Sequence, residues 1–275
     1  MFGLSTTEIV MLAVALLAAG GITGVLAGLF GVGGGAIIVP VLYEVYRILG
    51  VPEEVRMASC VGASLAIIIP TSIRSFRAHN ARGAADLSVL KAWAAPIVVG
   101  VAMGAALARY APPAVFKIVF VCVAAVSAVR LLGGFAWRLA DDLPKGPLML
   151  LYGWIVGFLS SLMGIGGGQL SNLIMMFHNR PIHQTVATSS GVGMLIAIPG
   201  TLGYMLAGWG KAGLPPLSIG FVSLIGVALF IPASVATAPL GVKIAHALSK
   251  RKLELAFGAF LLIVCLRFLI SLLGW

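Results

Sequence analysis

Apolar residues run in two unusually long tracts that no charged residue interrupts, at 9–43 and 146–179. Each tract is about 35 residues long, whereas one transmembrane helix needs about 20 and two helices with a turn need more than about 40. Each length therefore predicts a long helical arm, a break and a shorter arm. The stretches "GVGGG" and "GIGGG" mark the breaks, so the predicted arms are 9–30 and 36–43, then 146–163 and 169–179.

Six further apolar segments follow the arms, and polar or charged residues separate them. Each segment is long enough for one membrane crossing of about 20 residues. The chain is therefore predicted to be an all-α polytopic membrane protein. The six segments cover residues 56–77, 88–108, 114–133, 184–208, 217–240 and 253–273.

The two halves of the chain repeat one another. The segment "GVLAGLFGVGGG" (24–35) aligns with "GFLSSLMGIGGG" (157–168) at a shift of 133 residues, and "IPTS" (69–72) aligns with "IPGT" (198–201) at a shift of 129. A third match, "GAALARY" with "GVKIAHA", has a shift of 137 and keeps the same order. The matches predict a first transmembrane repeat at 1–137, a polar linker at 138–146 and a second repeat at 147–275.

Each predicted repeat holds about five helices or half-helices, and it crosses the membrane an odd number of times. The number is five if both arms cross and three if the arms form a re-entrant hairpin. Consecutive repeats therefore enter the membrane from opposite sides, which is the inverted-repeat plan of secondary transporters. Lys and Arg concentrate in loops such as 74–82 and 249–252. Because basic loops favour the cytoplasm, both termini are predicted to lie outside.

Composition agrees with a membrane protein and argues against several other classes. Hydrophobic residues make up 60% of the 275 residues and charged residues 9%, against about 25% charged in soluble domains. The net charge of +10 is assigned to loops that set the topology, because no patch of basic and aromatic residues predicts binding to nucleic acid. Cys60, Cys122 and Cys265 lie in apolar segments without a CxxC pattern, so no metal site and no cofactor are predicted.

The glycine breaks form the first candidate site. Irregular backbone at membrane depth is tolerated where it lines a cavity or is buried in protein. Each break precedes a short helix, whose first N–H groups carry partial positive charge and attract anions. The alternative is that these glycines let neighbouring helices pack closely. The residues predicted to bind a small anionic substrate through their backbone are Gly33, Gly34, Gly35, Gly166, Gly167 and Gly168.

Small polar side chains near the breaks form the second candidate set. Ser64, Thr188 and Ser189 begin the next helix in each half, and they are predicted to donate hydrogen bonds to an oxyanion unless they bond to their own helix backbone. Gln169 and Asn172 lie one helical turn apart just after the second break. The matching places in the first half hold Ala36 and Val39, so the predicted cradle is chemically asymmetric.

Catalysis finds no support in the sequence. No Ser-His-Asp arrangement and no buried pair of carboxylates is apparent, so the chain is not predicted to be an enzyme. Pro70 and Pro199 align in the repeat and are the candidate hinges for a movement of one half against the other.

Several motifs are similar to those of the sulfite exporter TauE/SafE family, and they cover most of the chain in the family order. The resemblance rests on "GLFGVGGGAIIVPVL", "SSLMGIGGGQLSNLIMM", "GASLAIIIPTSIRSFRAHNARG", "PIHQTVATSS" and "FIPASVATAPLGVKIAH". Ala63 stands where the family pattern has a threonine, so the first half has one hydroxyl group fewer. The resemblance implies a multi-pass carrier of the bacterial inner membrane for sulfite, thiosulfate or organosulfonates such as sulfoacetate.

The expected function is export of such an anion by alternating access, in which one repeat rocks against the other. With a bacterial inner membrane, both termini are expected in the periplasm. The expected partners are the small anionic substrate and the lipid bilayer, and a homo-oligomer is compatible with the sequence. Two alternatives stay open at this point. One is an anion channel, or a carrier for another small oxyanion or carboxylate, and the other is a non-transporting membrane scaffold.

Overall fold

Ten helices and one short hairpin make up the part of the chain that the computed structural model describes, which is residues 6–30, 35–81, 83, 85–134 and 139–273. The first half holds α1 (Thr6–Phe30), α2 (Gly35–Ile48), α3 (Glu53–Asn80), α4 (Leu87–Ala108) and α5 (Pro113–Gly133). The second half holds α6 (Pro147–Met163), α7 (Gly168–Phe177), α8 (Ile182–Ala207), β1 (Ser218–Ile219), β2 (Val222–Ser223), α9 (Leu224–Ala247) and α10 (Lys250–Leu272).

The prediction of an all-α polytopic membrane protein is confirmed. Six of the described helices (α3, α4, α5, α8, α9 and α10) are long and apolar enough to cross a membrane. Many large apolar side chains on their outer faces are exposed, among them Val99, Ile118 and Ile263. Such a surface suits contact with lipid, because a soluble monomer rarely exposes apolar patches of this extent.

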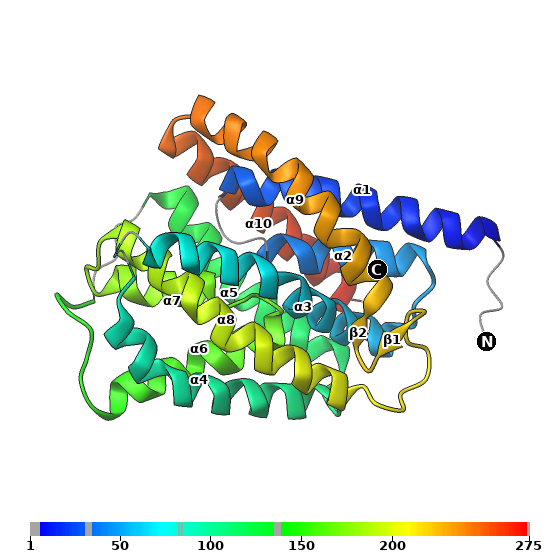
Figure 1. The fold of residues 1–275 in the computed structure, drawn as a ribbon, viewed down its shortest axis with the longest axis horizontal. Helices are drawn as coiled ribbons and strands as arrows, with labels where there is room; N and C mark the ends of the chain where they lie inside the picture. Colours follow the sequence, from blue (N-terminus) through cyan, green and yellow to red (C-terminus); the bar gives the residue numbers. More distant parts are fainter. Residues whose placement is uncertain (1–5, 31–34, 82, 84, 135–138, 274–275) are drawn as a thin grey trace.

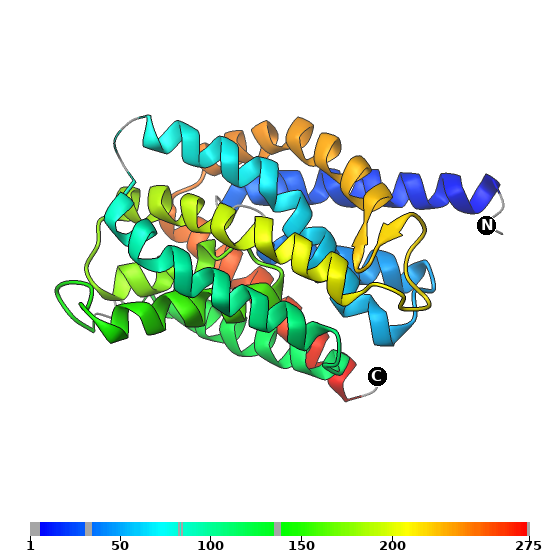
Figure 2. The ribbon, with the colours of Figure 1, turned by 60° about the horizontal axis from the view of Figure 1, so that its bottom comes forward.

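The helices form a bundle in which the axes of most neighbouring helices are roughly aligned (Figure 1). The helices α3 and α8 pack against each other at its centre and run in opposite directions, as do α5 and α10 (Figures 1 and 2). The start of α1 and the end of α10 lie at one end of the bundle, called here the terminal end. The connections α3–α4, α5–α6, α7–α8 and α9–α10 lie at the other, called here the basic end.

The short arms after the glycine breaks turn back before they cross the membrane. The helix α7 has 10 residues, which span about 15 Å, half of a hydrocarbon core of about 30 Å. It leads back to the basic end, from which α6 had entered (Figure 1). The helix α2 has 14 residues and leads back to the terminal end, from which α1 had entered. Each short arm therefore returns toward the end of the bundle from which its long arm came.

Among the predicted boundaries that were wrong, two have identifiable reasons. The segment at 217–240 does not begin as a helix, because residues 218–223 pair as the antiparallel hairpin β1–β2 and α9 starts only at Leu224. The helix α2 continues past the predicted end at residue 43 to Ile48. Its last turn carries Glu44, whose carboxylate accepts from Arg47 of the same helix and from Arg267 of α10, each at 2.8 Å. These ion pairs stabilise a polar helix end that hydropathy alone did not reveal.

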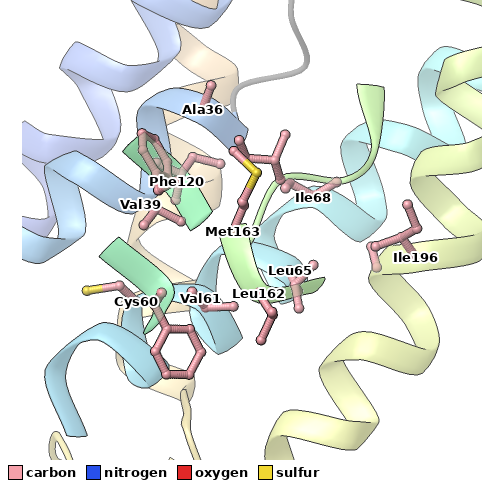
Figure 3. Packing of buried hydrophobic residues seen from close by; sticks show 14 of the residues in the cluster. Ala36, Val39, Cys60, Val61, Leu65, Ile68, Phe120, Leu162, Met163 and Ile196 are labelled. Atoms are coloured by element: carbon pink, nitrogen blue, oxygen red, sulfur yellow. The ribbon is translucent and has the colours of Figure 1, made fainter. Parts of the chain in front are cut away.

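The buried core joins both halves of the chain around the short arms. Figure 3 shows side chains of α2, α3, α5, α6 and α8 gathered in one cluster. The arm α2 is deeply buried, and Ile37 and Leu42 have no exposed surface. The labelled members of the cluster are Ala36, Val39, Cys60, Val61, Leu65, Ile68, Phe120, Leu162, Met163 and Ile196.

One close helix contact occurs in both halves of the chain at equivalent positions. The helix α1 packs against α9 in the way that α6 packs against α4. A Cβ atom added to Gly24 would overlap the carbonyl oxygen of Ser234, and one added to Gly157 would overlap that of Ile97. Gly24 and Gly157 align in the repeat, and so do Ile97 and Ser234 at the shift of 137. The same close approach of helix backbones is thus built twice, as small residues allow in membranes.

A side chain at either of these glycines is expected to destabilise the protein. Gly24→Ala and Gly157→Ala should each cost about 1–3 kcal/mol, because the added methyl group must push two packed helices apart. The lowered melting temperature of the detergent-solubilised protein would measure this. Gly21→Ala is the matched control, since its Cβ would meet its nearest atom, Thr237 Cγ2, at an ordinary 3.7 Å. Equal melting temperatures for Gly21→Ala and Gly24→Ala would contradict the packing argument.

Candidate functional site

The two halves touch at their glycine breaks. Gly35 opens α2, and a Cβ added there would lie 2.9 Å from Ile165 Cα and 3.3 Å from the backbone nitrogen of Gly166. The break between α6 and α7 needs glycine for its backbone, because Gly164 and Gly167 adopt φ values of +65° and +71° that other residues rarely tolerate. Gly33 and Gly34 lie outside the described residues.

A pocket of about 80 Å³ lies beside this contact. It is large enough for a small solute or several water molecules, since one water needs roughly 10–15 Å³ by this kind of measure. Its walls come from the start of α2, the break before α7, one face of α3 and the first turns of α8. The lining residues are Gly35, Ile68, Thr71, Ser72, Ser75, Gly166, Gly168, Asn172, Val186, Ser189 and Ser190.

The chemistry of this lining suits an anion. Two helix N-termini border the pocket, at Gly35 and Gly168, and each brings unpaired N–H groups and partial positive charge. Five of the eleven lining residues carry a hydroxyl group, and none of the lining residues described is acidic or basic. The hydroxyl groups of Thr71, Ser189 and Ser190 donate to carbonyl oxygens of their own helices. The N–H groups at the two helix N-termini are therefore the main donors for a negatively charged guest, which meets no competing carboxylate among the described lining residues.

Polar groups without partners lie next to the second break. Asn172 lines the pocket, and its Oδ1 is buried and makes no hydrogen bond within the part of the chain that the structure describes. The side chain of Gln169 is 8% exposed, and neither its Oε1 nor its Nε2 has a partner. Such groups are costly to bury unless something pairs with them. Gln169 is not among the lining residues, so only Asn172 directly faces the pocket in this conformation.

Of the three predicted hydroxyl residues, only Ser189 lines the pocket. Its Oγ donates to the carbonyl oxygen of Val186 at 2.9 Å, which is the bonding to the own helix that the sequence left open. Ser64 is fully buried and donates to the carbonyl oxygen of Gly164 at 2.6 Å. Ser64 thereby ties α3 to the second glycine break instead of facing the pocket. Gly167 is buried between Val192 and Ile196 and also lies outside the lining.

Thr188 holds a loop at the basic end. Its Oγ1 accepts a hydrogen bond from the backbone N–H of Asp86 at 2.8 Å. Asp86 is the N-cap of α4, where its carboxylate accepts from Ser88 and from the amide of Val89. Burial raises the pKa of Asp86, but these hydrogen bonds outweigh it and hold the pKa below its ordinary value. The cap therefore contributes stability at neutral pH that is lost as the pH falls through the lowered pKa.

Removing the Thr188 hydroxyl is expected to loosen this loop without weakening substrate binding. Thr188→Val should lower the free energy of unfolding by about 1 kcal/mol, because the half-buried amide of Asp86 loses its acceptor. A thermal melt in detergent would measure the loss, and the concentration dependence of anion flux should stay unchanged. A raised half-saturating concentration with an unchanged melting temperature would instead place Thr188 at the substrate.

Most of the α3 wall was not predicted. Ile68, Thr71, Ser72 and Ser75 recur at the spacing of one helix face. Thr71 and Ser72 belong to the repeated "IPTS" motif, so the repetition of that motif could have identified them as candidate site residues. Pro70, a predicted hinge, is exposed within the continuous helix α3, and Pro199 lies within α8. Their role as hinges stays a prediction.

Comparison with known proteins places the chain among membrane transporters. The family model described as "Sulfite exporter TauE/SafE" matches residues 16–268. A probable membrane transporter protein of Haemophilus influenzae is 29% identical over 248 residues, which are 90% of this chain and 94% of that protein. One of Methanocaldococcus jannaschii is 30% identical over 263 residues, covering 92% and 94%. No solved structure matches the chain.

Proposed function

The chain belongs to the sulfite exporter TauE/SafE family, and from this premise we propose that it exports small sulfur-containing anions across the bacterial inner membrane. Its relatives are named as membrane transporters, so it is a multi-pass membrane transporter and not an enzyme. Sulfite and organosulfonates such as sulfoacetate are the proposed substrates. Their oxygens would accept from backbone N–H groups at the glycine breaks and from the hydroxyl groups of the pocket.

The observation that carries this proposal is the meeting of two helix N-termini at one uncharged pocket. Gly35 and Gly168 bring these N-termini from different halves of the chain. Backbone donors at helix N-termini favour anions with several oxygens. The unpaired Oδ1 of Asn172 fits a guest that also donates a hydrogen bond, such as a protonated oxyanion or a bound water molecule.

A carrier suits the pocket better than a channel. Between α3 and α8, the side chains toward the terminal end of the bundle are closely packed, and Val61, Ala197 and Tyr204 have no exposed surface. A channel needs a continuous path, whereas a carrier exposes its site to one side at a time. The pocket and this packed layer together support alternating access.

The matched helix contacts support the proposed inverted repeats, 1–137 and 147–275. Arg267 of α10 pairs with Glu44 of α2, while its repeat mate Arg130 of α5 lies over the ring of Phe177 in α7 at 5.5 Å. Glu44 and Phe177 align at the shift of 133. Each arginine thus contacts the end of the short arm of the opposite repeat, at an equivalent place.

The proposed orientation puts the basic end in the cytoplasm and both termini in the periplasm. The exposed side chains of Arg74, Arg77 and Lys91 belong to the basic end, and basic residues favour the cytoplasmic side. An inside-negative potential then drives a negative charge outward by about 2.3 kcal/mol per 100 mV. Export of an anion therefore needs no coupling ion in this proposal.

Flux into proteoliposomes tests the proposed function. Purified protein should carry labelled sulfite or sulfoacetate into vesicles with a positive interior, at a rate that saturates with anion concentration. Unlabelled sulfite or sulfoacetate should compete, and protein-free vesicles are the control. Flux no faster than in these controls for either anion would overturn the proposal, and flux that never saturates would favour the channel.

A further inference from the structure

The walls of the pocket have repeat mates on the other side of the glycine breaks. Residues 58–72, "ASCVGASLAIIIPTS", align with 187–201, "ATSSGVGMLIAIPGT", at the shift of 129. Because α3 and α8 run in opposite directions, residues near the basic end on one helix have mates near the terminal end on the other. The mates of Ser72, Ser75, Ser189 and Ser190 are Thr201, Tyr204, Cys60 and Val61.

Two of the four equivalent pairs differ in exposure, while Ser72 and Ser189 of the pocket are themselves buried, at 9% and 5%. Ser75 and Ser190 in the pocket are partly exposed, whereas Cys60, Val61 and Tyr204 have no exposed surface. Thr201 is 5% exposed, and its Oγ1 donates to Ala197 of its own helix. One side of the α3–α8 seam is therefore open and the equivalent other side is closed.

A hairpin covers the closed side. Phe221, between β1 and β2, is 2% exposed, and its backbone N–H donates to the carbonyl oxygen of Tyr204 at 3.1 Å. Its own carbonyl oxygen comes within 2.6 Å of where a Cβ of Gly62 would lie. The hydroxyl of Tyr204 donates to the carbonyl oxygen of Ser161 at 2.9 Å. The equivalent α3–α4 connection, residues 81–86, is much shorter than the α8–α9 connection that holds this hairpin.

We propose that a second access cavity opens between α3 and α8 at the terminal end, lined by Cys60, Val61, Thr201 and Tyr204. The β1–β2 hairpin with Phe221 must lift from Gly62 for it to open. The inference rests on the proposed alternating access, in which two equivalent halves exchange conformations. The new cavity would be less polar than the present pocket, because cysteine and valine replace two serines. Its walls would therefore hold an anion less tightly and favour release.

The native cysteine makes this cavity testable. Cys60 becomes the lone thiol in a Cys122→Ala/Cys265→Ala variant, and the matched reporter for the present pocket is Ser189→Cys in a cysteine-free background. Both are treated with a membrane-impermeant maleimide in sealed vesicles of each orientation. Sulfoacetate is the added anion, because sulfite itself reacts with maleimides. Sulfoacetate flux is measured in the same vesicles.

The expected result is labelling of the two reporters from opposite sides of the membrane. If adding sulfoacetate speeds the labelling of Cys60, it should slow the labelling of Ser189→Cys, and the reverse should also hold. The lone Cys265 of a Cys60→Ala/Cys122→Ala variant is the control for general unfolding, since it is 3% exposed and contacts α5 away from the seam. Cys60 should react at least about tenfold faster than this control, because the open state need be only a minor population.

Two readouts keep this inference separate from the proposed function. Labelling of Cys60 no faster than that of Cys265, or from the same side as Ser189→Cys, overturns the second cavity even where sulfoacetate flux is rapid. Absent flux overturns the proposed function, while labelling of Cys60 from the opposite side would still support the cavity.

Discussion

Gly35→Ala is expected to reduce sulfoacetate flux at low concentration by about 10- to 100-fold while the protein stays folded. The added Cβ would lie 2.9 Å from Ile165 Cα and 3.0 Å from Ile68 Cδ1, so the two glycine breaks must move apart. The loss of one hydrogen bond from a backbone N–H to a charged guest accounts for the size of the effect, at about 1.5–3 kcal/mol. The measurement is the flux into proteoliposomes over a range of concentrations.

The matched control for this change is Gly21→Ala. Gly21 lies in α1 of the same repeat, and its added Cβ has room beside Thr237. Its flux should equal that of the unmodified protein. Among the described glycines, Gly35 lies closest to the backbone of the opposite break. Flux at the unmodified rate in Gly35→Ala would therefore show that transport does not depend on the contact between the two breaks.

The helices could be predicted from the sequence because membrane-spanning segments are long and uniformly apolar. The start of α4 at Leu87 and the end of α5 at Gly133 lie within one residue of the predicted positions. The breaks were equally visible, since glycine runs interrupt otherwise apolar tracts. The hairpin β1–β2 was missed because Ile219, Phe221 and Val222 are as apolar as the helix that follows.

The pocket residues on α3 and α8 were harder to predict than those at the glycine breaks. Hydroxyl residues recur throughout α3 and α8, and only tertiary packing decides which of them face the pocket. Ser64 and Ser72 lie on one helix eight residues apart, yet Ser64 bonds to the second glycine break while Ser72 lines the pocket. Thr188 and Ser189 are neighbours, and they point to a loop and to the pocket respectively. Sequence spacing identifies the face of a helix, but it does not identify what that face meets.

The two short arms have the same origin in the repeat but different chemistry. In α2, Ala36 and Val39 are completely buried in the apolar core. Their mates in α7 are Gln169, whose amide oxygen and nitrogen are buried without partners, and Asn172, whose amide oxygen is buried without a partner among the described residues. A polar group is costly to bury unpaired, so these two side chains indicate that α7 contributes side chains to binding, whereas α2 contributes only the backbone of its N-terminus. Substrate selectivity is therefore expected to depend on α7.

Asn172→Leu is expected to separate transport from stability. Leucine has the same branching as asparagine and as many heavy atoms in its side chain, and it removes a buried oxygen that has no hydrogen-bond partner among the described residues. The free energy of unfolding should therefore rise by about 1 kcal/mol. The half-saturating concentration of sulfoacetate should rise about 10- to 100-fold, because a hydrogen bond to a charged or water-bridged guest is lost. Thermal melts and concentration-dependent flux measure the two effects.

Met175→Leu on the same short helix is the control for this prediction. Met175 is 1% exposed, one turn beyond Asn172 and outside the pocket lining, and the exchange of methionine for leucine conserves its volume. Both its flux and its melting temperature should stay close to those of the unmodified protein. If Asn172→Leu lowered the melting temperature and left the half-saturating concentration unchanged, Asn172 would be a structural residue. The anion site would then consist of backbone donors and hydroxyl groups alone.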